Sequence, residues 1–291
     1  MLMLLGFIVL ITCLVIGVRR GGIGLAAVSA IGLVFFIFVM HLNPGKPPVD
    51  VMLTIMAVVT CSAFLQASKG LDVMLKYAEK FLRSNPKYIT ILAPITTWVL
   101  AVLCGTGHVV YAMFPIIYDI AIKQNIRPER PMAVSSIASQ RGVCASPASV
   151  AVVSVVAILG ASPHPFGVMQ ILSISIPATF IGVVMAGLWS LNRGKDLDKD
   201  EMFQAKIADP EQKAFVYGDL ADKSLVNIKL PSSAYKAAGI FLMGIVVIAI
   251  FGSFPQLLPK FADAKGVLKP FSMTPVIQLM MLSIAAIIMM V

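Results

Sequence analysis

Long stretches without charged side chains constrain this chain more than any other feature. Residues 1–18 contain no charged residue, and comparable apolar segments recur along the chain. A soluble fold would have to expose much of this surface to water, whereas a helix of about 20 apolar residues matches the hydrocarbon core of a bilayer. Only 13% of the 291 residues are charged and 58% are hydrophobic, a composition that favours the membrane. We therefore expect a polytopic membrane protein with an all-α fold.

The apolar segments predict where the membrane helices lie. They cover residues 2–18, 22–42, 49–67, 88–104, 108–122, 132–160, 168–191, 237–254 and 274–291. The first segment has no basic residue before it and no small-residue cleavage site, and Arg19 and Arg20 follow it. We therefore expect a retained first span rather than a cleaved signal peptide.

Two of these segments are too short to cross a bilayer comfortably. Segments 88–104 and 108–122 meet at the sequence GTGH, residues 105–108. Glycine-rich sequence does not continue a helix easily. We expect a re-entrant hairpin over about 88–122 that turns back inside the membrane.

One segment is too long for a single span. Segment 132–160 is interrupted by the sequence ASPAS at residues 145–149. Its proline removes a backbone donor and clashes with the preceding turn of a helix. We expect a broken helix over about 132–160, and irregular backbone at membrane depth is tolerated where it lines a cavity or is buried in protein.

The distribution of Lys and Arg predicts the orientation. If the N-terminus lies outside and the hairpin enters from the inner side, the inner connections are 19–21, 68–87, 123–131 and 192–236. They hold 18 of the 23 Lys and Arg residues, whereas the outer connections hold 4. Positive charge concentrates on the inner side of a membrane protein, so this orientation is favoured. Two full spans in place of the hairpin would give the same sidedness, and only the short segments and the glycines favour a hairpin.

The chain divides into three parts. We expect a first transmembrane repeat over residues 1–191, a cytoplasmic linker over 192–236 and the incomplete start of a second transmembrane repeat over 237–291. Residues 70–84 have apolar side chains at helical spacing, which predicts an amphipathic helix on the inner surface.

The two interruptions supply the candidate substrate site. Helix ends that meet at membrane depth present free N–H groups and positive dipole ends, an arrangement that binds a carboxylate. The candidate substrate-binding residues at the two interruptions are Gly105, Thr106, Gly107, His108, Ser146, Pro147 and Ser149. The alternative is structural: the glycines would only allow close packing, the proline would only kink a helix, and His108 would be a packing residue.

Four charged residues are candidates for a charged pathway to that site. Glu79 and Arg83 form an i, i+4 pair on the predicted amphipathic helix. Arg127 lies at the inner mouth of the hairpin, and Arg141 lies within an apolar segment, where an arginine is costly and is a functional hypothesis by default. Each of these residues could instead only set the orientation of the chain in the membrane, or form a local ion pair.

Several classes of function are disfavoured. The four cysteines lie in apolar segments and form no CxxC pair, and no His or carboxylate lies at the spacing of metal ligands. The net charge of +9 is spread over many loops and indicates topology rather than nucleic-acid binding. The sequence contains no HExxH motif, no GxSxG motif and no pair of acidic residues inside the apolar segments, so it offers no support for an enzyme. We expect no metal, no cofactor and no catalytic residue.

Several long motifs resemble a known family. They are PGKPPVDVM (44–52), LDVML (71–75), AEK (78–80), NPKYITILAP (85–94), CGTGHVVY (104–111), NIRPERPMA (125–133) and GKDLDKDE (194–201). Together they resemble the anaerobic C4-dicarboxylate transporters, and most closely the DcuB-type members. The resemblance runs along essentially the whole chain.

The resemblance implies a fold and a function. It implies inverted repeats, each with a re-entrant hairpin and a broken helix that jointly hold substrate. It implies exchange or uptake of fumarate, malate, aspartate and succinate across the inner membrane of anaerobically respiring bacteria, with a periplasmic N-terminus. Membrane lipid, a homo-oligomer and a sensor-kinase partner are further implied at the family level, and nucleic acid is not.

The sequence departs from that family in two places. Arg141 stands where an apolar residue is expected, which weakens a family-level role for it. The chains of the family also continue beyond residue 291, so the sequence is expected to be truncated within its second repeat and residues 1–291 alone are expected not to transport. Alternatives are a carrier of another carboxylate such as citrate or lactate, and a membrane partner that binds dicarboxylate without transport.

Overall fold

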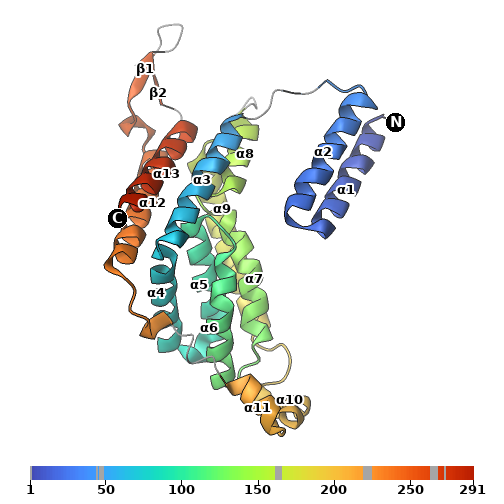
Figure 1. The fold of residues 1–291 in the computed structure, drawn as a ribbon, viewed down its shortest axis with the longest axis vertical. Helices are drawn as coiled ribbons and strands as arrows, with labels where there is room; N and C mark the ends of the chain where they lie inside the picture. The colour runs from blue at the N-terminus through green and yellow to red at the C-terminus, as the bar shows by residue number, and fades with distance from the viewer. Residues whose placement is uncertain are drawn as a thin grey trace. The chain divides into compact units, whose positions relative to one another are not determined.

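The computed structural model describes residues 2–43, 45, 49–160, 166–218, 225–262, 268–271 and 273–291. The chain forms two units, Met1–Pro48 and Val49–Val291, each of which is considered by itself (Figure 1). Helices dominate both units, which confirms the predicted all-α class. Within the described ranges, six helical segments are long and apolar enough to cross a membrane: Met3–Arg20, Val49–Ala67, Pro86–Cys104, Val168–Ser190, Ser232–Ser253 and Met273–Met290. Segment 88–104, expected to be too short, reaches this length because the turn at Pro86–Tyr88 extends it.

The first unit is a helical hairpin. Helix α1 (Leu2–Arg20) packs along α2 (Gly22–Phe38). The turn is made by Gly21, whose φ is 67° and whose N–H donates to the carbonyl oxygens of Gly17 and Val18. The helices approach closely, because a Cβ built on Gly32 would lie 2.9 Å from the Sγ of Cys13. Most side chains of both helices are exposed, as expected for apolar helices that face lipid.

The second unit contains the remaining helices and one small sheet. Its elements are α3 (Val49–Ala67), α4 (Gly70–Ser84), η1 (Pro86–Tyr88), α5 (Ile89–Cys104), α6 (Val109–Lys123), α7 (Glu129–Val143), α8 (Val150–Gly160), α9 (Val168–Ser190), η2 (Leu197–Lys199), α10 (Glu201–Ile207), α11 (Pro210–Tyr217), η4 (Leu225–Asn227), α12 (Ser232–Ser253), η5 (Pro255–Leu257), β1 (Lys260–Ala262), β2 (Leu268–Pro270) and α13 (Met273–Met290).

The two predicted interruptions are present as helix ends. Helices α5 and α6 lie side by side and are joined at residues 105–108, and α7 ends before residues 144–149 and is followed by α8. Helix α5 packs most extensively on α7, and α9 covers both. Helices α5 and α7 approach closely at Gly142: a Cβ built there would lie 2.7 Å from the Cβ of Ala101 and 2.7 Å from the carbonyl oxygen of Trp98.

A second packing layer joins α3 to α12 and α13. The Nε2 of Gln278 on α13 donates to the carbonyl oxygen of Asp50 and to the hydroxyl of Thr54, both at 2.9 Å. Helices α12 and α13 approach closely at Gly244, where an added Cβ would meet Ile284. Since α3 also contacts α8, this layer supports the side of the bundle on which the two interruptions lie.

Helix α4 has the predicted bounds, and its apolar face is covered by protein. Its buried side chains are Val73, Met74, Leu75, Ala78, Glu79 and Leu82, and it packs against α12, α6 and α5. It ends at Asn85, before Pro86. The helix is therefore part of the bundle rather than a segment that lies on a bare membrane surface.

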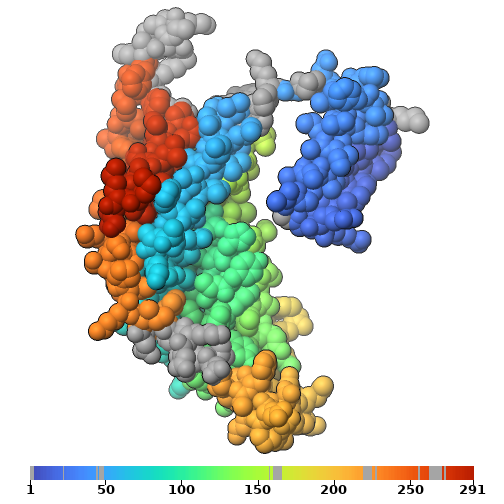
Figure 2. Space-filling view, viewed as in Figure 1, coloured from blue at the N-terminus to red at the C-terminus, as the bar shows by residue number. Residues whose placement is uncertain are grey.

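Two connections contain structure that periodicity did not predict. The 192–236 linker forms the short helices α10 and α11, which are capped at their N-termini by the side chains of Asp200 and Asp209. Figure 2 shows them gathered at one end of the second unit. The connection between α12 and α13 forms an antiparallel pair of strands, β1 and β2, with Phe261 opposite Lys269.

The glycine contact between α5 and α7 can be tested by adding one methyl group. Gly142→Ala forces a Cβ to within 2.7 Å of backbone and side chain on α5, and overpacking of this kind costs about 1–3 kcal/mol. We expect the thermal unfolding midpoint of the purified protein to fall by several degrees. Gly239→Ala on α12 is the matched control, because a Cβ there meets nothing within 4 Å and alanine favours a helix. Equal midpoints for the two variants would contradict the close contact.

Candidate functional site

The hairpin tip lies against the break between α7 and α8. Gly105 ends α5 in the left-handed region, with φ 67°, and a Cβ on it would lie 2.8 Å from the carbonyl oxygen of Ala148. A Cβ on Gly107 would lie 2.5 Å from the Nε2 of Gln140. Gly105 is therefore required both for its backbone conformation and for its closeness to the break. At Gly107 the neighbour is the end of the exposed, flexible Gln140 side chain of α7, which can move aside.

The serines of the break bind their own backbone. The Oγ of Ser146 accepts the N–H of Ala148 and the Oγ of Ser149 accepts the N–H of Val152, each at 3.2 Å. Both serines and Pro147 are buried. Ser149 thus caps the first turn of α8 in the usual manner of a hydroxyl at a helix start. These hydroxyl oxygens hold the broken helix in shape, and their role toward a substrate remains a prediction.

A cavity of about 330 Å³ lies between α3, the hairpin tip and the start of α8. It is lined by Val58, Val59, Ser62, Ala63, Gln66, Cys104, Gly105, Thr106, His108 and Val150. Four of these side chains carry hydrogen-bonding groups, and no Lys, Arg, Asp or Glu is among them. The predicted tip residues Gly105, Thr106 and His108 therefore share one cavity, whereas Gly107 and the serines of the break do not line it.

Local contacts orient the two polar side chains of the tip. The hydroxyl oxygen of Thr106 accepts the backbone N–H of His108 at 3.3 Å. The exposed ring of His108 stacks on Tyr111, with ring centroids 5.9 Å apart and an interplanar angle of 22°. Helix α6 begins directly after His108, so its positive dipole end lies beside the cavity. The arrangement offers neutral donors and a partial positive charge to an anion.

Ser62 and Gln66 of α3 were not predicted. They are four residues apart on one face of the helix and line the cavity opposite the tip. The available signal was a serine and a glutamine in the inner half of the largely apolar segment 49–67, which also contains Asp50, Thr54 and Thr60. Periodicity alone did not show which way that face of α3 points.

Glu79 and Arg83 belong to a larger ionic network that the sequence showed only in part. The Nε of Arg83 lies 2.7 Å from the Oε1 of Glu79, and its second nitrogen lies 2.8 Å from the Oδ2 of Asp119 on α6. Lys123 lies 2.7 Å from the Oδ1 of the same Asp119. The backbone N–H of Leu225 donates to the Oε2 of Glu79 at 2.8 Å. The network joins α4, the hairpin and the linker.

The network keeps the Arg83 guanidinium charged. Burial disfavours the charged form, but the hydrogen bonds and charges of Glu79 and Asp119 outweigh it and raise the pKa of Arg83 above its ordinary value. Both carboxylates are buried, and Arg83 is mostly so. Among the described residues, both carboxylates face Arg83 and Asp119 also faces Lys123, so these charges are paired and the network fixes structure.

The other two predicted charges lie elsewhere. Arg127 pairs with Asp200 at 3.2 Å and Glu129 at 3.3 Å, between the hairpin base and the linker. Arg141 is exposed and lines a separate groove between α7 and α9. The structure therefore does not bring the four charged residues into one pathway, although Glu79 and Arg83 do lie together.

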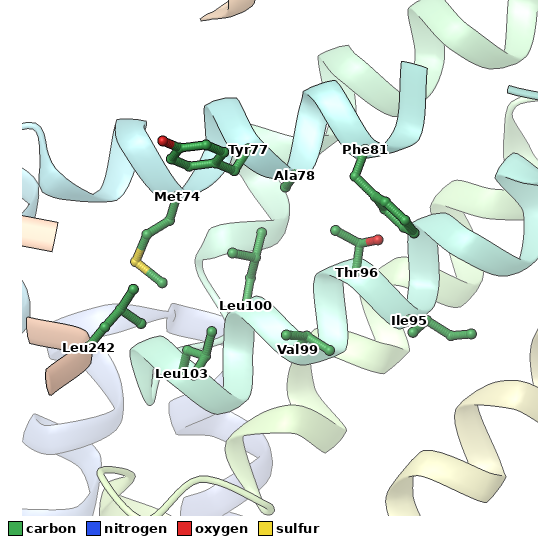
Figure 3. Close-up of a pocket in the computed structure, with 10 residues that line it drawn as sticks. All are labelled: Met74, Tyr77, Ala78, Phe81, Ile95, Thr96, Val99, Leu100, Leu103 and Leu242. Carbon is green, nitrogen blue, oxygen red and sulfur yellow. The ribbon is translucent and has the colours of Figure 1, made fainter. Parts of the chain in front are cut away.

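The remaining cavities differ in chemistry. The cavity in Figure 3, of about 430 Å³, lies between α4, α5 and Leu242 of α12, and its walls are apolar apart from the hydroxyls of Tyr77 and Thr96. Such a cavity offers little to an anion. Within the described ranges, no group of three or more His, Cys, Asp or Glu side chains is placed to hold a metal ion.

Comparisons with known proteins identify relatives of this chain. A family described as "Anaerobic c4-dicarboxylate membrane transporter" matches residues 2–291. The chain is 54% identical over 291 residues to the anaerobic C4-dicarboxylate transporter DcuB of Escherichia coli O6:H1, which covers 99% of this chain and 64% of that relative. No solved structure matches significantly.

More distant relatives carry similar names. The C4-dicarboxylate transporter DcuA of Wolinella succinogenes is 38% identical over 201 residues, or 69% of this chain and 46% of that relative. DcuA of Escherichia coli K12 is 32% identical over 245 residues, or 84% of this chain and 54% of that relative. The chain thus spans less than two thirds of the length of the relatives it matches.

The contact of the tip with the break can be tested through a native thiol. Gly105→Ala strains the left-handed backbone and forces a Cβ against the Ala148 carbonyl, so the tip must move. We expect alkylation of Cys104, which is 2% exposed, to accelerate at least about tenfold. Cys13 of the first unit serves as the internal reference. Gly182→Ala is the control, because a Cβ there meets nothing within 4 Å, and an unchanged rate for Gly105→Ala would argue against the contact.

The ionic network generates a second prediction. Arg83→Met leaves the buried carboxylates of Glu79 and Asp119 with less compensating charge, and breaking a buried pair costs about 3–5 kcal/mol. We expect a strong loss of folded protein in membranes, measured by fluorescence-detected size exclusion. Adding Glu79→Gln and Asp119→Asn to Arg83→Met should restore part of it. If the triple variant is no better than the single one, charge compensation is not the reason for the loss.

Proposed function

The chain belongs to the anaerobic C4-dicarboxylate membrane transporter family, and we propose that it carries C4-dicarboxylates such as fumarate, malate, aspartate and succinate across the inner membrane. The observation that supports this most directly is the hairpin tip packed on a helix break beside an uncharged cavity that carries a few hydrogen-bonding side chains. Paired interruptions of this kind form carboxylate sites in membrane carriers.

The cavity chemistry suits a carboxylate that must be bound and then released. Thr106 and His108 offer a hydroxyl and an imidazole, and α6 begins at the same place. We propose that these groups bind one carboxylate of the substrate. Gly105 and Gly107 then serve the site by letting the tip lie against the break, and Ser146, Pro147 and Ser149 serve it by shaping the break.

The proposed orientation places the N-terminus in the periplasm and the linker in the cytoplasm. The turn before α5, the turn after α6 and the linker are tied together through Arg127, Asp200 and the network around Arg83. They therefore lie on one side, and the connections that contain them, 68–87, 123–131 and 192–236, hold 16 of the 23 Lys and Arg residues of the chain. The hairpin would then enter and leave from the cytoplasm, with its tip inside the membrane.

Several finer features remain proposals. They are inverted repeats with substrate held between them, exchange rather than net uptake, a role in anaerobic respiration, a homo-oligomer and a sensor-kinase partner.

Substrate exchange by the product of the complete reading frame tests the proposal. Vesicles containing the purified protein and labelled fumarate should release the label when succinate is added outside, at least about tenfold faster than empty vesicles. Thr106→Val, which keeps the shape and removes the hydroxyl, should slow release with little loss of folded protein. Release driven by citrate or lactate but not by succinate would contradict the proposed substrate class.

A further inference from the structure

Helix α3 presents two polar side chains to the same cavity from the side opposite the hairpin tip. Ser62 and Gln66 are one helical turn apart and both line it, together with Val58, Val59 and Ala63. Side chains four residues apart on a helix lie on one face, so this face of α3 forms a wall. The wall is apolar apart from one hydroxyl and one amide.

These two side chains are not used by the fold. Among the described residues, neither the half-buried Ser62 hydroxyl nor the exposed Gln66 amide has a hydrogen-bond partner. Thr54 and Thr97 behave differently, because each donates to the carbonyl oxygen four residues earlier, at 2.7 and 2.8 Å. The hydroxyls of Ser135 and Ser175 also have no partner among the described residues, but neither lines this cavity. A polar side chain in an apolar span is costly unless it is matched by a partner or by water. The cavity is where such a partner can bind.

We propose that Ser62 and Gln66 form a second carboxylate subsite and that this subsite makes the protein select dicarboxylates over monocarboxylates. The proposal rests on the proposed function, in which the tip binds the first carboxylate. Ser62 offers one O–H donor and Gln66 offers two N–H donors, and a carboxylate accepts from both. A ligand with one carboxylate can accept hydrogen bonds from the donors of the tip or from those of α3, but not from both.

The selectivity follows from the cost of an unmatched polar group. When a ligand places a methyl group against donors that a carboxylate would occupy, those donors lose water without gaining a partner. Sites built to bond a polar group therefore reject analogues that lack it far more strongly than apolar pockets reject an extra group. Fumarate and crotonate make this comparison directly, because crotonate has a methyl group in place of one carboxylate of fumarate.

The experiment measures that selectivity in vesicles that contain the product of the complete reading frame and exchange labelled fumarate. Unlabelled fumarate and crotonate are titrated as inhibitors, and the ratio of their half-inhibitory concentrations is the readout. Gln66→Leu removes the amide at similar volume, and Ser62→Ala removes the hydroxyl. We expect each to reduce the preference for fumarate at least about tenfold while the half-inhibitory concentration of crotonate changes little.

Two further variants keep the test decisive. Gln66→Glu retains size and polarity but places a negative charge against the second carboxylate, so fumarate inhibition should weaken more than crotonate inhibition. Thr60→Ala removes a hydroxyl from α3 at a position that does not line the cavity, and the fumarate preference should be unchanged. If Gln66→Leu does not fold, Ser62→Ala and Gln66→Glu decide the outcome.

The outcomes separate this inference from the proposed function. An unchanged ratio in the Ser62 and Gln66 variants, or an equal loss of both inhibitors, would overturn the second subsite while exchange by the unmodified protein still supports the transporter. Absence of fumarate exchange by the unmodified protein would overturn the proposed function and this inference with it. A fall in the ratio confined to these variants supports the second subsite.

Discussion

The irregular backbone at each of the two helix interruptions is covered by the other interruption. At membrane depth, peptide groups outside a regular helix must be covered by protein or by a polar cavity. The tip at Gly105 and the break at Ala148 meet these needs together, because each shields the other. Ser146 also accepts the N–H of Ala148 within the break, and Ser149 accepts the N–H of Val152 in the first turn of α8. The cavity forms on the side of the tip that faces α3. The site is thus a consequence of how irregular backbone is accommodated.

The ion pairs of the second unit lie away from that site. Arg83 and Lys123 face Glu79 and Asp119, and Arg127 faces Asp200. These pairs join α4, the base of the hairpin and the linker, so they fix the end of the hairpin remote from the tip. A buried pair that loses one member leaves an uncompensated charge, which makes this end of the bundle resistant to separation while the tip is held mainly by packing.

The sequence was sufficient to place the helices and the interruptions, and insufficient to place the walls of the site. Apolar runs located α1 to α3, α5 to α9, α12 and α13, and the amphipathic spacing of residues 70–84 located α4. Gly105 and Pro147 marked breaks because each has a backbone restriction that can be read from its residue type. The partners of Arg83 could not be read in the same way, since Asp119 lies 36 residues away and is brought near only by packing of α4 on α6. For the same reason Ser62 and Gln66 appeared as isolated polar residues in an apolar span.

In the proposed function, substrate must leave the site as readily as it binds there. The chemistry of the two cavity walls fits that requirement. No Lys or Arg lines the cavity, so an empty site holds no fixed cation that would need a counter-charge. Hydroxyl, amide and imidazole groups can be satisfied by water when substrate is absent and by carboxylate oxygens when it is present. Two neutral walls would then discriminate by geometry, because only a ligand with acceptors at both ends satisfies both of them. The cavity is therefore expected to select the spacing of two carboxylates rather than the total negative charge.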